Sequence, residues 1–151
     1  MKLLLQIGRG SEAALAHVYR CHAAAVFAVS RWILGDVARA EEVTEEVFVD
    51  LWERPAEFDP RRGSLRAHLV LRARRLSLDR LASHGAGPLL GPSMWQRPRP
   101  APATALPAEE REVLELTFFA GYTCRQLAEL LQVPEATVKT RIREGLDRLR
   151  A

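Results

Sequence analysis

At 151 residues the chain can hold one ordinary domain or two small ones, and a hydrophobic content of 48% excludes a wholly disordered protein. No apolar run approaches the roughly 18 residues of a membrane span, and the N-terminal segment lacks the apolar stretch and cleavage site of a signal peptide. We therefore expect no membrane insertion and a cytoplasmic protein. The two cysteines, Cys21 and Cys124, lie far apart without a CxxC neighbour, so we interpret both as small, mostly buried apolar residues.

The net charge of +3 is modest, but its distribution along the chain is uneven. Residues 36–57 contain eight acids against two arginines, a balance of −6, and residues 60–80 contain seven arginines against one acid, a balance of +6. An acidic segment followed directly by a basic one indicates two different partners, or one partner with two kinds of surface. The alternative is a pair of solvated helix faces that happen to differ in charge.

Three amphipathic patterns precede residue 85. Apolar residues recur at spacings of three and four between Leu15 and Leu34, which predicts one or two helices. The next helix, Glu41 to Trp52, carries one apolar stripe, and acids occupy the rest of its circumference, so we expect an acid-rich outer surface. A third helix is expected to begin near Ser64, a suitable N-cap.

Residues 85–104 are rich in Gly and Pro and show no sustained period, which predicts a flexible linker between domains at 1–84 and 105–151. We interpret Trp95 as a loose contact with a neighbouring domain. Roughly 20 residues in extended polyproline form span roughly 60 Å, and two helical turns of DNA measure about 70 Å. Two domains joined in this way could dock at separate sites on one duplex.

A helical pattern resumes at Leu106 and continues to Gly121, and Pro107 suits its start because a first-turn residue needs no N–H donor. Thr123 to Leu131 then predicts a short helix, with Leu127, Ala128, Leu130 and Leu131 on its inner side. No strand pattern of useful length occurs anywhere. The predicted fold is therefore all-α, with two small helical domains.

Pro134 interrupts the last helical run, so the chain is expected to turn there and begin a second helix with a polar, cationic leading end. A short helix, a tight turn and such a second helix form a helix-turn-helix, whose second helix enters the major groove of DNA. The alternative is an ordinary αα-hairpin with solvated basic residues.

Two stretches resemble the extracytoplasmic-function sigma factors, the smallest initiation subunits of bacterial RNA polymerase. They are "GDVARAEEVTEEVFVDLWERPAEFDPRRGSLRAHLVLRARRLSLDRL" in the first half and "LPAEEREVLELTFFAGYTCRQLAELLQVPEATVKTRIREGLDRLR" at the end. The resemblance implies a first domain that holds core polymerase and reads the downstream promoter element, and a second domain that reads the upstream element. It also implies an anti-sigma protein that covers both domains of the sigma factor while the sigma factor is not bound to polymerase.

The resemblance assigns roles to individual residues. The acidic helix resembles the segment that binds the clamp helices of the polymerase's largest subunit, with these contacts: Glu42, Glu45, Glu46 and Asp50. The loop from Asp59 to Ser64 resembles the family's base-capturing loop, and the following helix resembles the one that lies along the promoter backbone. The resemblance therefore assigns these residues to the downstream promoter element, the −10 element: Arg61, Arg62, Ser64, Arg66, Arg72, Arg74, Arg75 and Arg80. The resemblance assigns the following residues to base contacts with the upstream promoter element, the −35 element: Thr137, Lys139, Thr140 and Arg141. It assigns Arg143 to a phosphate contact.

The chain departs from the family pattern at a few places. His68 stands where the family usually has tryptophan, which is expected to alter packing, or to make promoter melting pH-sensitive if the imidazole is partly buried. Glu45 stands where glutamine is common, and the linker is short, which would narrow the tolerated promoter spacing. A metal site can be drawn through His17, Cys21 and His22, but a fourth ligand is missing, so we expect no metal and no cofactor.

These observations favour a sigma factor that binds core RNA polymerase and promoter DNA. An enzyme is disfavoured, because the chain offers no nucleophile with a base, no phosphate-binding glycine loop and no metal cage. The alternative is a helix-turn-helix regulator without productive polymerase binding, and the acidic helix argues against it.

Overall fold

The computed structural model describes residues 2–84 and 105–150, and within these two ranges every regular element is a helix. The prediction of an all-α fold is confirmed. The predicted linker and Trp95 lie outside the described residues, so the linker and the domain boundaries stay predictions.

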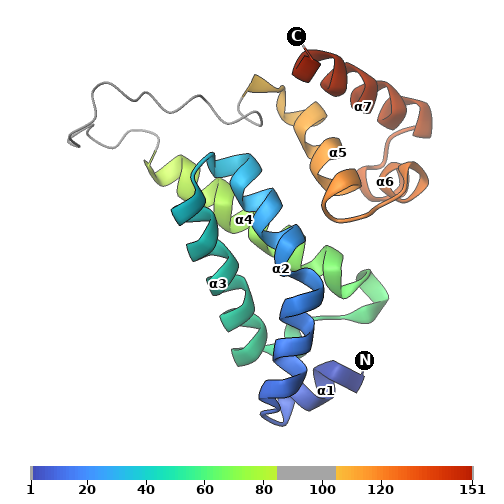
Figure 1. Cartoon of the computed structure of the whole chain (residues 1–151). Coiled ribbons are helices and arrows are strands. Elements are labelled where there is room, and N and C mark those ends of the chain that lie inside the picture. The colour runs from blue at the N-terminus through green and yellow to red at the C-terminus, as the bar shows by residue number, and fades with distance from the viewer. Residues whose placement is uncertain (1, 85–104, 151) are drawn as a thin grey trace, which may run out of the picture.

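The first domain consists of four α-helices and two short 3₁₀ turns (Figure 1). Their bounds are α1 Lys2–Gly8, α2 Glu12–Leu34, α3 Val37–Glu53, η1 Pro55–Glu57, η2 Pro60–Arg62 and α4 Leu65–His84. Helix α2 packs against both α3 and α4, and α1 lies against the start of α2. The pattern between Leu15 and Leu34 therefore belongs to one continuous helix, and α1 was not predicted.

Local capping explains where these helices begin and end. Ser11 accepts a hydrogen bond from the Ala14 N–H at 3.3 Å and begins α2, and Gly35, with φ of 70°, ends it. Asp36 then caps α3 in the same way. The predicted N-cap at Ser64 is confirmed, since its hydroxyl accepts from the Ala67 N–H at 3.1 Å.

The second domain is formed by α5 Ala108–Phe118, α6 Cys124–Leu131 and α7 Glu135–Arg150 (Figure 1). Thr123 and Gln126 form a reciprocal capping box at the start of α6. The chain turns through Gln132, which has φ of 55°, and Pro134 directly precedes α7. The predicted helix-turn-helix is therefore present, with Pro134 at its turn.

Buried apolar side chains of both domains form one continuous cluster, from Val26 and Val70 in the first domain to Val113 and Leu127 in the second. Figure 1 shows the second domain beside α2. The sequence indicated two domains on a flexible connection and did not predict this direct contact.

Two predictions of burial are wrong. Cys21 is exposed on α2, although Cys124 is half-buried as expected. Leu130, expected on the inner side of its helix, is 54% exposed, while Leu127 is fully buried. A short helix needs only a narrow apolar stripe to pack, and Leu130 lies outside that stripe.

Candidate polymerase and nucleic-acid interfaces

Three of the six acids of α3 are paired with arginines of α4. Asp50 accepts from both Nε and Nη2 of Arg72, at 3.1 and 2.7 Å. Arg80 donates to Glu42 at 3.0 Å and to Glu46 at 2.5 Å. The expected acid-rich surface is present at Glu41, Glu45 and Glu53, which are exposed, whereas the three paired acids face the basic helix of the same domain.

A groove of about 1020 Å³ lies on the other side of α3, between α3 and α2. Its lining is mostly apolar and aromatic, and the acids at its edge include Glu41 and Glu45, both exposed. The lining aromatic residues are Tyr19, Phe27, Phe48 and Trp52. Val49 is 45% exposed beside them. An apolar groove with an acidic edge suits an amphipathic helix that carries basic side chains.

The loop before α4 presents cations that have no side-chain partner in the part of the chain that the structure describes. Arg61 and Arg62 are exposed, and the Asp59 carboxylate accepts from the Arg61 backbone N–H at 2.9 Å, which shapes the turn. Arg75, on α4, is also exposed and unpaired within the described residues. These three guanidinium groups are available to phosphates without prior rearrangement.

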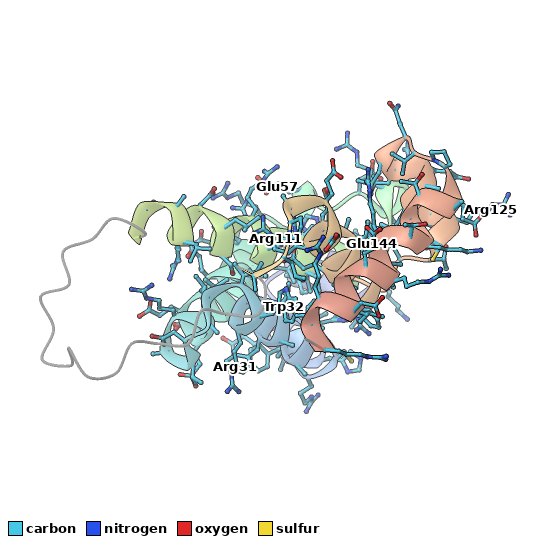
Figure 2. All side chains as sticks on the ribbon, turned by 90° about the horizontal axis from the view of Figure 1, so that it is seen from above. Arg31, Trp32, Glu57, Arg111, Arg125 and Glu144 are labelled. Atoms are coloured by element: carbon cyan, nitrogen blue, oxygen red, sulfur yellow. The ribbon has the colours of Figure 1, made fainter. Side chains whose placement is uncertain are left out.

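Two further arginines of α4 contact the second domain. The Arg66 Nε donates to the carbonyl oxygen of Phe119 at 2.9 Å. The Arg74 Nε donates to the carboxylate of Glu115, which is fully buried. Figure 2 labels Trp32 of α2 and Arg111 of α5 in this region, near the centre of the molecule.

The predicted upstream-element readers lie on the first half of α7. Lys139 pairs with Glu135 at 3.5 Å, and Arg141, half-buried, pairs with Glu109 of α5 at 3.5 Å. The Thr140 hydroxyl donates to the Ala136 carbonyl at 2.9 Å. Thr137 is half-buried, and Arg143 is exposed with no side-chain partner in the described ranges. These side chains occupy the leading end of the second helix, where a helix-turn-helix meets base edges.

Two histidines of the first domain have altered titration. Burial, with the nearby charge of Arg72, lowers the pKa of His68, which packs edge-on against Phe58 with ring centroids 5.3 Å apart. Burial likewise lowers the pKa of His22, with Arg66 and His17 acting in the same direction. Both imidazoles therefore favour the neutral form more strongly than in the unfolded chain.

The metal hypothesis receives no support from geometry. His17 Nε2 lies 3.7 Å from Cys21 Sγ, one helical turn away. Within residues 2–84 and 105–150, no group of three or more His, Cys, Asp or Glu side chains is arranged to hold a metal ion.

Comparison with protein families identifies the class to which this fold and these surfaces belong. Residues 18–86 match Sigma-70 region 2, and residues 104–151 match Sigma-70 region 4. An ECF RNA polymerase sigma factor, SigK of Mycolicibacterium vanbaalenii, is 30% identical over 98% of this chain and 86% of its own length. SigK of Mycobacterium tuberculosis strain H37Rv is 27% identical over 98% of this chain and 90% of its own.

The chain belongs to the ECF sigma factors of bacterial RNA polymerase. Members of this family recognise promoters and initiate transcription together with RNA polymerase, and they are not enzymes. The predicted family is therefore confirmed.

Solved structures share the fold. CnrH, in complex with the cytosolic domain of CnrY, aligns with a TM-score of 0.62 at 23% identity, over 98% of this chain and 92% of that one. The sigma factor RpoE of Bartonella quintana, in complex with the anti-sigma factor NepR, aligns with a TM-score of 0.63 at 16% identity, over 89% and 93% of the two chains. In the described parts of this chain, no helix is long and apolar enough to cross a membrane.

Sequence reasoning missed the residues that join the two domains and those that line the groove. The residues at the contact between the domains belong to no recognisable sequence motif: Glu115, Trp32 and Phe119. An acid or an aromatic residue within a helical pattern is compatible with either a core or a surface position. Glu41 and Val49 were also missed, although their position on α3 placed them beside Glu45 on one helix face.

We expect His68 to make the fold sensitive to acid. Because its pKa is lower in the folded state than in the unfolded state, where it is about 6.5, stability should fall as pH drops from above 6.5 towards and through the folded pKa. Urea unfolding at about pH 7.5 and about pH 5 should show a smaller loss of unfolding free energy in His68→Phe than in the wild type. A constant packing penalty cancels in this difference, and an equal loss in both proteins would contradict the assignment.

Proposed function

We propose that this sigma factor binds core RNA polymerase through the α2–α3 groove and reads a two-part promoter with its two domains. The first domain contacts the −10 element and the second the −35 element. The observation that supports this most directly is the groove itself, since a regulator that only binds DNA needs no apolar, acid-edged surface remote from its helix-turn-helix.

The polymerase contacts proposed on α3 are Glu42, Glu45, Glu46 and Asp50. Among them Glu45 lines the groove, is exposed and has no ion pair with the part of the chain that the structure describes, so it can meet a basic partner directly. The other three are paired within the domain, so a partner's cations would compete with Arg72 and Arg80 for them.

The −10 contacts proposed divide into two sets. Arg61, Arg62 and Arg75 are exposed and unpaired within the described residues, and they would meet DNA first. The remaining set is engaged within the folded chain: Ser64, Arg66, Arg72, Arg74 and Arg80. The −35 contacts proposed are Thr137, Lys139, Thr140 and Arg141, with Arg143 on phosphate.

We also propose that the protein is cytoplasmic. When it is not bound to core polymerase, an anti-sigma factor binds it. The support is the relation to sigma factors that were solved with such partners, CnrH with CnrY and RpoE with NepR. No cofactor is proposed.

Run-off transcription from fragmented source DNA tests the function as a whole. Purified core polymerase, with and without this protein, transcribes the fragments, and the 5′ ends of the products are sequenced. We expect new starts that share a two-part upstream motif. If the folded protein binds DNA and an active core preparation gives no new starts, the regulator is the better description.

The groove is tested by reversing one charge. Glu45→Lys places a cation where a basic partner is expected, so it should weaken core binding about ten-fold, equivalent to about 1.4 kcal/mol. Glu53→Lys is the matched control, because Glu53 is exposed on the same helix but does not line the groove. Fluorescence anisotropy of labelled protein with core measures both variants. Equal weakening by both would show a general charge effect rather than docking in the groove.

The recognition helix is tested by a pair of arginines. Arg141→Ala should cost roughly 1 to 3 kcal/mol and relax preference at one upstream base, because a base-edge contact carries sequence information. Arg143→Ala should weaken binding about equally for all sequences, as a phosphate contact does. Binding to a set of single-base promoter variants separates the two. An unchanged preference at every upstream position in Arg141→Ala would exclude its proposed role.

A further inference from the structure

Glu115 of α5 is a fully buried carboxylate between the two domains. It accepts a hydrogen bond from Trp32 Nε1 of α2 at 3.2 Å and another from Arg74 Nε of α4. Arg111, one turn earlier on α5, brings its Nε to 3.8 Å from the same carboxylate. We call these four residues the Glu115 cluster. Its donors from α2 and α4 belong to the first domain, and its acceptor belongs to the second.

A second polar contact lies close to the cluster, at the end of α5. Arg66 of α4 donates to the carbonyl oxygen of Phe119, which caps that helix, at 2.9 Å. A cation at a helix C-terminus is stabilised by the partial negative charge of the unpaired carbonyl groups there. The Phe119 ring also packs against Trp32, with ring centroids 6.1 Å apart. The last turn of α5 is therefore held by α2 and α4 together.

The cluster is not fully compensated electrostatically. Burial raises the pKa of Glu115, although the hydrogen bond and charge of Arg74, the charge of Arg111 and the hydrogen bond from Trp32 all act in the opposite direction. The Arg111 Nε is buried and has no hydrogen-bond partner among residues 2–84 and 105–150. A buried ion pair that leaves a polar group such as the Arg111 Nε unsatisfied adds little stability to the apolar contact around it. Such a contact can open when a competing ligand appears.

Two arginines of α4 that hold the second domain, Arg66 and Arg74, also belong to the set assigned to DNA. Arg74 is held by the buried Glu115 carboxylate with its side chain only 20% exposed, and Arg66, although exposed, is held against α5 through its Nε, so neither guanidinium can turn fully towards a phosphate while the second domain is in place. We propose that the Glu115 cluster holds the free protein in a closed, autoinhibited state, in which the second domain withholds Arg66 and Arg74 from DNA. This proposal rests on the proposed role of α4 in promoter binding.

Opening is tested first, without DNA or polymerase. Glu115→Ala removes the acceptor and leaves Trp32 and two cations unpaired in the closed state, which should favour separation of the domains. Glu112→Ala is the matched control, because it lies on the same helix, removes the same charge and has no side-chain partner in the described ranges. Small-angle X-ray scattering of the full chain should show a larger radius of gyration for Glu115→Ala only. Equal radii for the two variants would overturn the closed state.

Folding must be controlled in the same experiment. Far-UV circular dichroism should give the wild-type helix content for both variants, since the change affects a contact between domains. If the Glu115→Ala variant has a lower helix content than the wild type, the scattering experiment uses the Trp32→Phe variant in its place. Phenylalanine keeps a ring against Phe119 but removes the indole N–H, so the radius of gyration should increase in the same direction by a smaller amount. A wild-type radius in a folded Trp32→Phe would then count against the proposal.

Autoinhibition is tested with a fluorescein-labelled duplex of two helical turns and arbitrary sequence, because backbone contacts do not depend on sequence. If the open form makes up roughly one molecule in ten, Glu115→Ala should bind about ten-fold more tightly than wild type at low salt, and more tightly than Glu112→Ala. In an Arg66→Ala, Arg74→Ala background this gain should disappear. A larger radius of gyration with the affinity of the control would show that the contact does not withhold DNA-binding groups.

Failure of this proposal can be distinguished from failure of the proposed function. Run-off transcription by the wild type with core polymerase reports the function. Scattering and duplex binding report the closed state, and neither measurement involves polymerase.

Discussion

The charge pairing between α3 and α4 determines which surfaces of the first domain remain available to partners. Packing both helices on α2 brings a strongly acidic helix beside a strongly basic one, so Asp50 and Arg72 neutralise each other. What remains is separated in space. Exposed acids stand at the α2–α3 groove, and exposed arginines stand in the loop before α4 and at Arg75. A single small domain therefore presents one surface for a basic partner and another for an anionic one.

The arginines of α4 differ in how easily they can be transferred to phosphate. Arg80 pairs with partly exposed carboxylates, and ion pairs of that kind contribute about 0 to 1 kcal/mol, so a phosphate can replace them at little cost. Arg74 pairs with a fully buried carboxylate, and its release requires the second domain to move away. The same basic helix thus holds groups that are ready for DNA and groups whose availability depends on domain arrangement.

Much of the fold could be predicted because it depends on local signals. Ser64 as an N-cap, Pro134 at the turn and the apolar spacing in α2 each act within a few residues, and each was confirmed. Contacts between distant segments left no such signal. Glu115 reads as an ordinary helical acid, and only the approach of α2 and α4 buries it. For the same reason the groove and the ion pairs of α3 were not predicted, since periodicity identifies a helix face but not the neighbour that covers it.

The chemistry of Glu115 explains why a carboxylate, rather than an apolar side chain, suits this contact. An apolar residue at the same position would add to the continuous core and hold the domains together whatever else bound to α4. A carboxylate makes part of the contact, beside the shared apolar core, depend on Arg74, and a guanidinium binds carboxylate and phosphate with similar geometry. DNA therefore competes for the same group that maintains the closed state. Once Arg74 has moved to a phosphate, the carboxylate that remains is costly to bury, so the bound state also disfavours closure.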